Sequence, residues 1–163
     1  MIEQGCLDGV DEAYGYHNIP NFDEGDIRVY EGPIFTACTD VKIKIIGQGG
    51  HGSAPHHVRD PITAISALHQ SLLSICSRNI DSRNNIVFTI CMINSGTTDN
   101  VYPDHVMMEG ILKSYDKESL ARMKERISTL CHSIAAAFDC EAEVTISSEE
   151  EDYPPTINHK EQA

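Results

Sequence analysis

The chain lacks tryptophan and is poor in basic residues. Only 12 lysine and arginine residues stand against 25 aspartate and glutamate residues, which gives a formal net charge of −13 at pH 7. Nucleic acids and anionic membrane surfaces bind proteins through basic patches, so neither is an expected partner. No apolar run reaches the roughly 18 residues that a membrane span needs, so no span is expected either.

The six cysteines lack the close pairing that marks metal-binding or redox motifs. No CxxC pair occurs, and the spacing does not suggest a disulfide framework, which favours a reducing, intracellular compartment, with the cytoplasm preferred over an organelle. Three cysteines lie in apolar segments and are expected to behave as small buried hydrophobes: Cys76, Cys91 and Cys131. The acidic start of the chain resembles neither a secretory signal nor an arginine-rich transit peptide.

What the chain does have is one alternating series of strands and amphipathic helices. Strands are predicted over 35–46, 86–93, 105–115 and 142–147, with a further short strand over 10–16. Asp60 and Pro61 are suited to open a helix over 61–77, and Asp116 caps a second helix with an apolar stripe at three-four spacing. The order βαββαβ predicts an α+β, ferredoxin-like sandwich: a four-stranded antiparallel sheet with two helices on one face.

The strand over 86–93 carries apolar residues on both faces and is rich in β-branched residues. It is therefore predicted to be buried on two sides. In the ferredoxin-like order this strand lies at a sheet edge, where an uncovered apolar strand promotes aggregation. We therefore expect a homodimer in which strand 86–93 pairs with its copy across a two-fold axis, flanked by helix 61–77.

A glycine-rich loop follows the first strand: Gly47-Gln48-Gly49-Gly50-His51-Gly52. Such a cluster is tolerable where the backbone turns sharply or approaches another group closely. His51 is the most conspicuous chemical group in this loop, although on spacing alone an ordinary loop histidine is the more frequent explanation. His56 and His57 are adjacent, and in extended chain their side chains would point to opposite sides, which argues against a shared metal.

Five segments, in order, resemble a family of metal-dependent amidohydrolases that includes aminoacylases, hippurate hydrolases and auxin-conjugate hydrolases. GQGGHGSAPHHVRDP (47–61) is similar to the family pattern GxGGHxxxPHxxxDP, and the other segments are GYHNIP (15–20), SRN (77–79), NSGTTDNVYPD (94–104) and YPPT (153–156). The resemblance implies that 35–148 is a lid and dimerisation domain, that 1–34 is a remnant of a catalytic domain with its linker, and that 149–163 returns toward that domain. The acidic run 149–152 is expected to be solvated.

The resemblance also implies roles for three residues. His17 matches a metal ligand of the family, which shares a two-metal site with residues from other parts of the enzyme. His51 matches a lid histidine that reaches the partner subunit's active site and stabilises the oxyanion, and Asn100 matches a lid asparagine that contacts substrate. On sequence alone, Asn100 as a turn residue in a polar loop is equally compatible. Lys113 stands where the family has arginine, which makes bidentate carboxylate recognition there doubtful.

The implied reaction is hydrolysis of an N-acylated amino acid or small peptide-like substrate by metal-activated water, with zinc, manganese or cobalt as the divalent metal of the complete enzyme. The general-base glutamate and most ligands of the family fall outside this chain, so the 163 residues alone are expected to bind no metal and to be inactive. The alternative is a non-catalytic dimerisation or scaffold module derived from that family, which could belong to a larger assembly.

Overall fold

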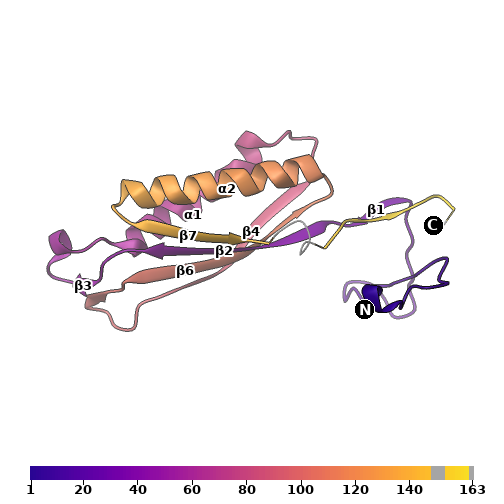
Figure 1. Ribbon diagram of the computed structural model, residues 1–163, viewed down its shortest axis with the longest axis horizontal. Coiled ribbons are helices and arrows are strands. Elements are labelled where there is room, and N and C mark those ends of the chain that lie inside the picture. The colour runs from indigo at the N-terminus through magenta and orange to yellow at the C-terminus, as the bar shows by residue number, and fades with distance from the viewer. Residues whose placement is uncertain (148–152, 162–163) are drawn as a thin grey trace.

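The computed structural model describes residues 1–147 and 153–161, and its centre is the predicted α+β sandwich. Four antiparallel strands form one sheet in the order β4-β6-β2-β7. Both long helices cover the same face of this sheet (Figure 1). The six elements are β2 Ala37–Ile46, α1 Pro61–Asn79, β4 Ile86–Ser95, β6 His105–Ser114, α2 Lys117–Ala137 and β7 Glu141–Ile146. The predicted ferredoxin-like order, with the second strand of the motif at an edge, is therefore confirmed.

Both helices begin at the aspartates that the sequence suggests. The Asp60 carboxylate accepts a hydrogen bond from the backbone N–H of Ile62 at 2.8 Å, and that of Asp116 accepts one from the N–H of Ser119 at 2.7 Å. Each bond satisfies a helix N–H that has no partner within the helix. The apolar stripes then face the sheet and are buried: Ile65, Leu68, Leu72 and Ile75 from α1, and Leu120, Met123, Ile127 and Cys131 from α2.

Strand β2 forms the centre of the sheet and the floor of the core. Val41, Ile43 and Ile45 are fully buried, whereas the alternating Lys42 and Lys44 face away from the helices and form ion pairs with Glu109 and Glu143. The strict alternation of burial along β2 follows from the period of two in a pleated strand.

Strand β4 differs from its prediction because it is not buried on two sides. Val87, Met92 and Ile93 are 54%, 42% and 47% exposed, and Cys91 is exposed as well. The helices cover only one face of the sheet, and nothing among the described residues pairs with the outer edge of β4. A register shift, which is a bulge or irregularity, interrupts the pairing of β4 with β6 between Ile90 and Met92. Of the three cysteines expected to be buried, only Cys131 is fully so; Cys76 is half-buried.

The N-terminal segment contains one short 3-10 helix, η1 (Ile2–Gln4), and no strand over 10–16, so that prediction is wrong. No neighbouring strand in the described residues offers this segment backbone partners. Chain entry and exit form a two-stranded ribbon of β1 (Gly32–Phe35) and β8 (Thr156–Asn158), at the opposite end of the molecule from β3 (Gly50–His51) (Figure 1). The acidic run 149–152 lies outside the described residues.

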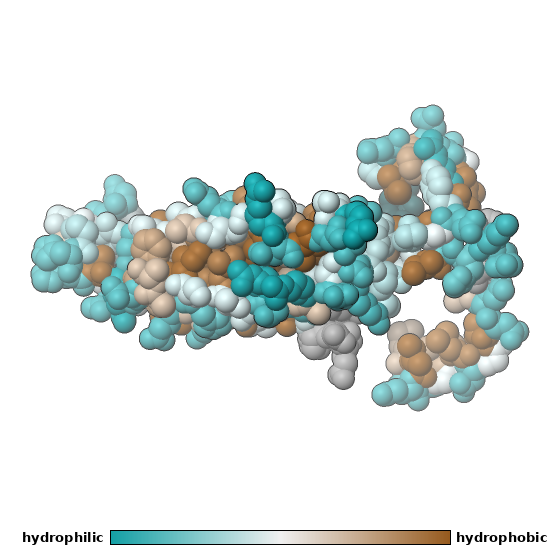
Figure 2. All heavy atoms as spheres, turned by 90° about the horizontal axis from the view of Figure 1, so that it is seen from above, coloured by the Kyte–Doolittle hydropathy of each residue, from teal (hydrophilic) through white to brown (hydrophobic). Residues whose placement is uncertain are grey.

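Hydrophobic side chains lie on the surface of the N-terminal segment. Tyr16 is 97% exposed and Ile27 88%, and residues 1–31 contribute more than half of the large exposed hydrophobic side chains. Figure 2 shows such side chains in brown over the outlying part of the molecule at the right. Many exposed apolar side chains on one segment are consistent with an interface with another structural unit.

Candidate functional site

The glycine-rich loop packs directly against the loop that precedes β6. Strand β3 pairs with β5 (Val101–Tyr102), and the N–H of Gly52 donates to the carbonyl oxygen of Asn100 at 2.8 Å. A Cβ on Gly49 would lie 2.5 Å from the carbonyl oxygen of Tyr102, and one on Gly47 would lie 2.1 Å from that of Arg59. Close backbone approach, one of the two reasons expected for these glycines, is therefore the one that applies at both positions.

This contact brings His51 and Asn100 together at the tip of the domain. His51 pairs in register with Val101, the residue after Asn100, and both His51 and Asn100 are exposed. The Oδ1 atom of Asn100 accepts a long hydrogen bond from the Thr98 hydroxyl at 3.3 Å, and its amide nitrogen is a further potential donor. A short helix, η2 (Pro55–His57), completes the tip. The side-chain nitrogens of His51 and Asn100 on one exposed surface suit a ligand with carbonyl or carboxylate oxygens.

His17 lies at the other end of the molecule. The centre of its ring lies 5.7 Å from that of Phe35, which comes two residues before β2, whereas His51 follows the end of β2. Ten residues of strand separate the two positions, which corresponds to roughly 30 Å. The three residues singled out from the sequence thus form two groups: His51 with Asn100 at the tip, and His17 alone at the base.

A metal centre is not formed within the part of the chain that the structure describes. No group of three or more histidine, cysteine, aspartate or glutamate residues there could hold an ion. His17 has the geometry of a single ligand: its Nδ1 lies 2.9 Å from the carbonyl oxygen of Asn18, so Nδ1 carries the proton and Nε2 keeps its lone pair. One ligand does not fit the two-metal site that the family resemblance implies.

An extended chain would direct His56 and His57 to opposite sides, but the structure does not. Both lie in η2, where their rings are 4.1 Å apart and tilted by 46°. Lys113 lies on β6, in register with Cys38 of β2 and Val87 of β4, toward the end of the sheet from which the ribbon leaves. It is therefore remote from His51 and cannot act with it in one chain.

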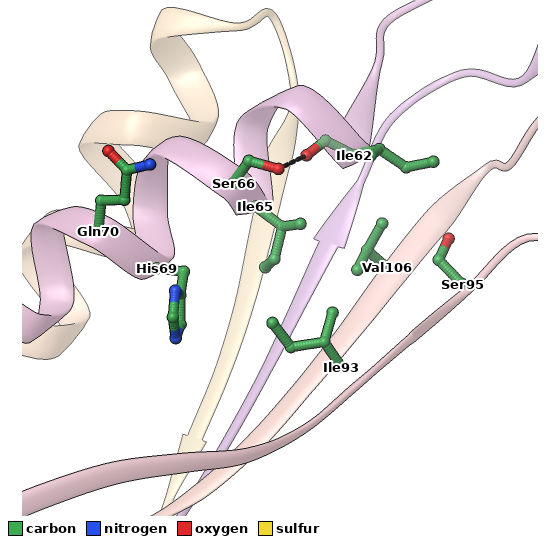
Figure 3. A pocket seen from close by; sticks show the side chains of 8 residues that line it. All are labelled: Ile62, Ile65, Ser66, His69, Gln70, Ile93, Ser95 and Val106. Atoms are coloured by element: carbon green, nitrogen blue, oxygen red, sulfur yellow. Dashed lines mark hydrogen bonds between the residues drawn. The ribbon is translucent and has the colours of Figure 1, made fainter.

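A second surface, which the sequence did not suggest as a site, lies beside β4. A hollow of about 440 Å³ opens between the first turns of α1 and the end of the β4 edge (Figure 3). Its walls are formed by Ile62, Ile65, Ser66, His69, Gln70, Ile93, Ser95 and Val106. Ile62 and Ile93 are 44% and 47% exposed, so the hollow presents uncovered apolar surface next to unpaired strand backbone.

Comparison with known proteins identifies the family to which this fold belongs. The peptidase dimerisation domain family matches residues 38–139, which run from β2 through α2. The chain belongs to this family. The chain is 38% identical over 144 residues to the N-acetyl-L-cysteine deacetylase of Bacillus subtilis and 36% identical over 146 residues to the hippurate hydrolase of Campylobacter jejuni, and each alignment covers 88% of this chain. It spans only 35% and 38% of those two proteins.

Solved structures agree with the sequence relatives. A proposed aminohydrolase from methicillin-resistant Staphylococcus aureus aligns with 98% of this chain and 42% of its own at a TM-score of 0.82 and 29% identity. The YxeP protein of Bacillus subtilis, described as a dinuclear metal-binding peptidase of the M20 family, aligns with 98% of this chain and 38% of its own at a TM-score of 0.67 and 28% identity. The chain thus contains a peptidase dimerisation domain and resembles the corresponding part of these longer proteins. Among the described residues, no helix is long and apolar enough to cross a membrane.

Proposed function

We propose that this dimerisation domain pairs with a second copy through β4 and so carries His51 into the active site of the partner subunit. The distance between His17 and His51 is the observation that carries the proposal. The two histidines lie at opposite ends of β2, so they can serve one active site only if they come from different chains.

The two edges of the sheet differ in a way that favours β4 as the pairing edge. The ten residues of β4, IVFTICMINS, include no charged side chain, whereas the opposite edge strand β7 carries Glu141 and Glu143. Charged residues on an edge strand oppose pairing with another chain, and an apolar edge invites it. Pairing would also cover the exposed side chains of Val87 and Ile93 and the hollow beside α1.

A two-fold axis at β4 makes the two copies antiparallel. The tip of one copy then points in the direction in which the base of the other copy lies. His51 and Asn100 of one subunit would approach the region of the partner that contains His17 and the N-terminal segment. The exposed apolar side chains of that segment are consistent with packing against a catalytic domain.

At the partner's site, His51 would donate a hydrogen bond to the oxygen that becomes negative when an amide carbonyl is attacked. A positioned donor of this kind is worth about 10²–10³ in kcat. Asn100 would hold the substrate through its amide. Since the relatives include a deacetylase of N-acetyl-L-cysteine and a hippurate hydrolase, we propose an N-acylated amino acid or small peptide-like molecule as the substrate of the complete enzyme. The complete enzyme would bind a divalent metal, zinc, manganese or cobalt, and His17 is the candidate ligand from this chain.

Complementation between two inactive variants of the complete enzyme tests the proposal. One variant carries His51→Ala and the other His17→Ala, and the two are mixed after dissociation or co-expressed. In a mixed dimer, one site receives an intact His17 from one chain and an intact His51 from the other. With random assortment, about one quarter of the wild-type activity should return, because half of the dimers are mixed and each of these has one intact site.

If both residues act within one chain, every site in the mixture contains a lesion and no activity returns, which would overturn the proposal. The 163-residue chain itself should hydrolyse no N-acyl amino acid with added zinc, cobalt or manganese. A complete protein that dimerises through β4 but hydrolyses no such substrate would instead support the non-catalytic module.

A further inference from the structure

We propose that Ser53 is a positioning residue that holds neutral His51 in the tautomer with its proton on Nε2. This tautomer matters for catalysis only through the role proposed above for His51. The tautomer itself can be measured without any reaction.

The geometry places two donors from Ser53 on one ring nitrogen of His51. The backbone N–H of Ser53 donates to Nδ1 at 3.2 Å, and the Ser53 hydroxyl oxygen lies 2.8 Å from the same atom. A backbone N–H can only donate, so Nδ1 must present its lone pair, and the hydroxyl must donate as well. In a neutral imidazole the remaining proton is then on Nε2.

The turn that presents these donors is itself anchored. The N–H of Ala54 donates to the carbonyl oxygen of His51 at 2.9 Å, and Gly52 is bonded to the backbone of Asn100. A Cβ on Gly52 would lie 3.0 Å from the Asn100 carbonyl oxygen, so this residue sits tightly against the neighbouring loop. Ser53 therefore holds a fixed position relative to the His51 ring although both side chains are exposed.

The consequence is that the exposed edge of His51 is a hydrogen-bond donor and not an acceptor. A donor is what an oxyanion requires, whereas the opposite tautomer would present a lone pair to a negative oxygen. His17 and His132 are held in the opposite way. Their Nδ1 atoms lie 2.9 and 2.7 Å from the carbonyl oxygens of Asn18 and Ser128, which can only accept.

The test is a long-range ¹H–¹⁵N correlation spectrum of the ¹⁵N-labelled 163-residue chain. It is recorded at about pH 8.5, two units above the pKa of an ordinary histidine side chain. His51→Gln and His132→Gln assign the two signals. We expect the protonated nitrogen of His51 to be Nε2 and that of His132 to be Nδ1, so His132 serves as an internal control in every spectrum.

Ser53→Ala removes the hydroxyl and keeps the backbone donor. We expect the ratio of Nε2–H to Nδ1–H in His51 to fall about fivefold, the effect of one neutral hydrogen bond, while His132 is unchanged. Ser53→Thr keeps the hydroxyl and should restore the ratio. A His51 proton on Nδ1 in the unmodified chain, or an unchanged ratio in Ser53→Ala, would overturn the inference. A tautomer as expected combined with failed complementation would remove only the trans-acting role of His51.

Discussion

Adding charge to the β4 edge should dissociate the proposed dimer. Val87 and Ile93 lie on this edge with about half of each side chain exposed, at 54% and 47%. Lysine on an edge strand is one of the devices by which proteins prevent strand pairing. The perturbation is therefore Ile93→Lys, alone and together with Val87→Lys.

The expected magnitude follows from the exposed fractions. Fully burying an isoleucine or valine is worth about 1.5–3 kcal/mol, so covering the exposed half contributes roughly 1 kcal/mol per side chain. A two-fold interface contains each residue twice, which makes the loss about 2 kcal/mol for Ile93→Lys, or roughly a 30-fold weaker dissociation constant. The double variant should lose about 4 kcal/mol, close to a thousandfold, before any repulsion between the lysines.

Light scattering coupled to size exclusion across a dilution series measures this directly. The unmodified chain should elute with twice its mass of 18.0 kDa, and the double variant as a monomer at micromolar concentration. Thr145→Lys is the matched control, since Thr145 is exposed on β7, at the edge of the sheet opposite β4. A monomeric parent chain, or equal weakening by the control, would refute the reasoning.

Three further predictions concern the fold. Gly49→Ala should lower the free energy of unfolding by about 1–3 kcal/mol, because the added Cβ would lie 2.5 Å from the Tyr102 carbonyl oxygen. It should also shift the amide NMR signals of His51 and Asn100. The control Gly15→Ala, where a Cβ meets open space, should change neither the stability nor these signals. Thr39→Val should raise the free energy of urea unfolding by roughly 1 kcal/mol, since the fully buried Thr39 hydroxyl has no hydrogen-bond partner among the described residues, and a loss of stability would contradict this. Asp116 accepts hydrogen bonds at the start of α2 from Ser119, which lower the pKa of its carboxyl. The folded-state pKa lies below the unfolded one, so the ionised cap stabilises the folded state. This stabilisation is complete above the unfolded pKa of about 3.9 and is lost as the pH falls through the folded-state pKa. Asp116→Asn should therefore flatten the acid limb of stability against pH, and an unchanged limb would count against this cap.

Local chemistry predicted most of the central fold. Asp60-Pro61 and Asp116 mark helix starts because their side chains satisfy N–H groups at the first turn, and the three-four spacing of α2 leaves only one face to bury. The alternation of lysine and branched residues in 41–45 fixes which face of β2 meets the helices. These signals are local, so one sequence suffices to interpret them.

The failures involve surfaces whose environment lies outside the chain. Apolar residues on both faces of 86–93 predict burial, but they do not say whether the covering group belongs to the same molecule. The segment 10–16 was expected to be a strand, yet strand formation depends on a neighbouring backbone that the described residues do not provide. The hydrogen bonds from Ser53 to Nδ1 of His51 depend on the backbone conformation of the turn that contains both residues. The sequence spacing of the two residues did not suggest these bonds.

Isotope-filtered NOE spectroscopy on an equimolar mixture of labelled and unlabelled chains tests the β4 interface most directly. It detects only protons that are close across two different molecules. We expect intermolecular contacts between the β4 strands of the two copies, Ile86–Ser95, with additional contacts from α1 beside the hollow. Contacts from β7 or the tip in place of β4, or none at concentrations where light scattering reports a dimer, would contradict it.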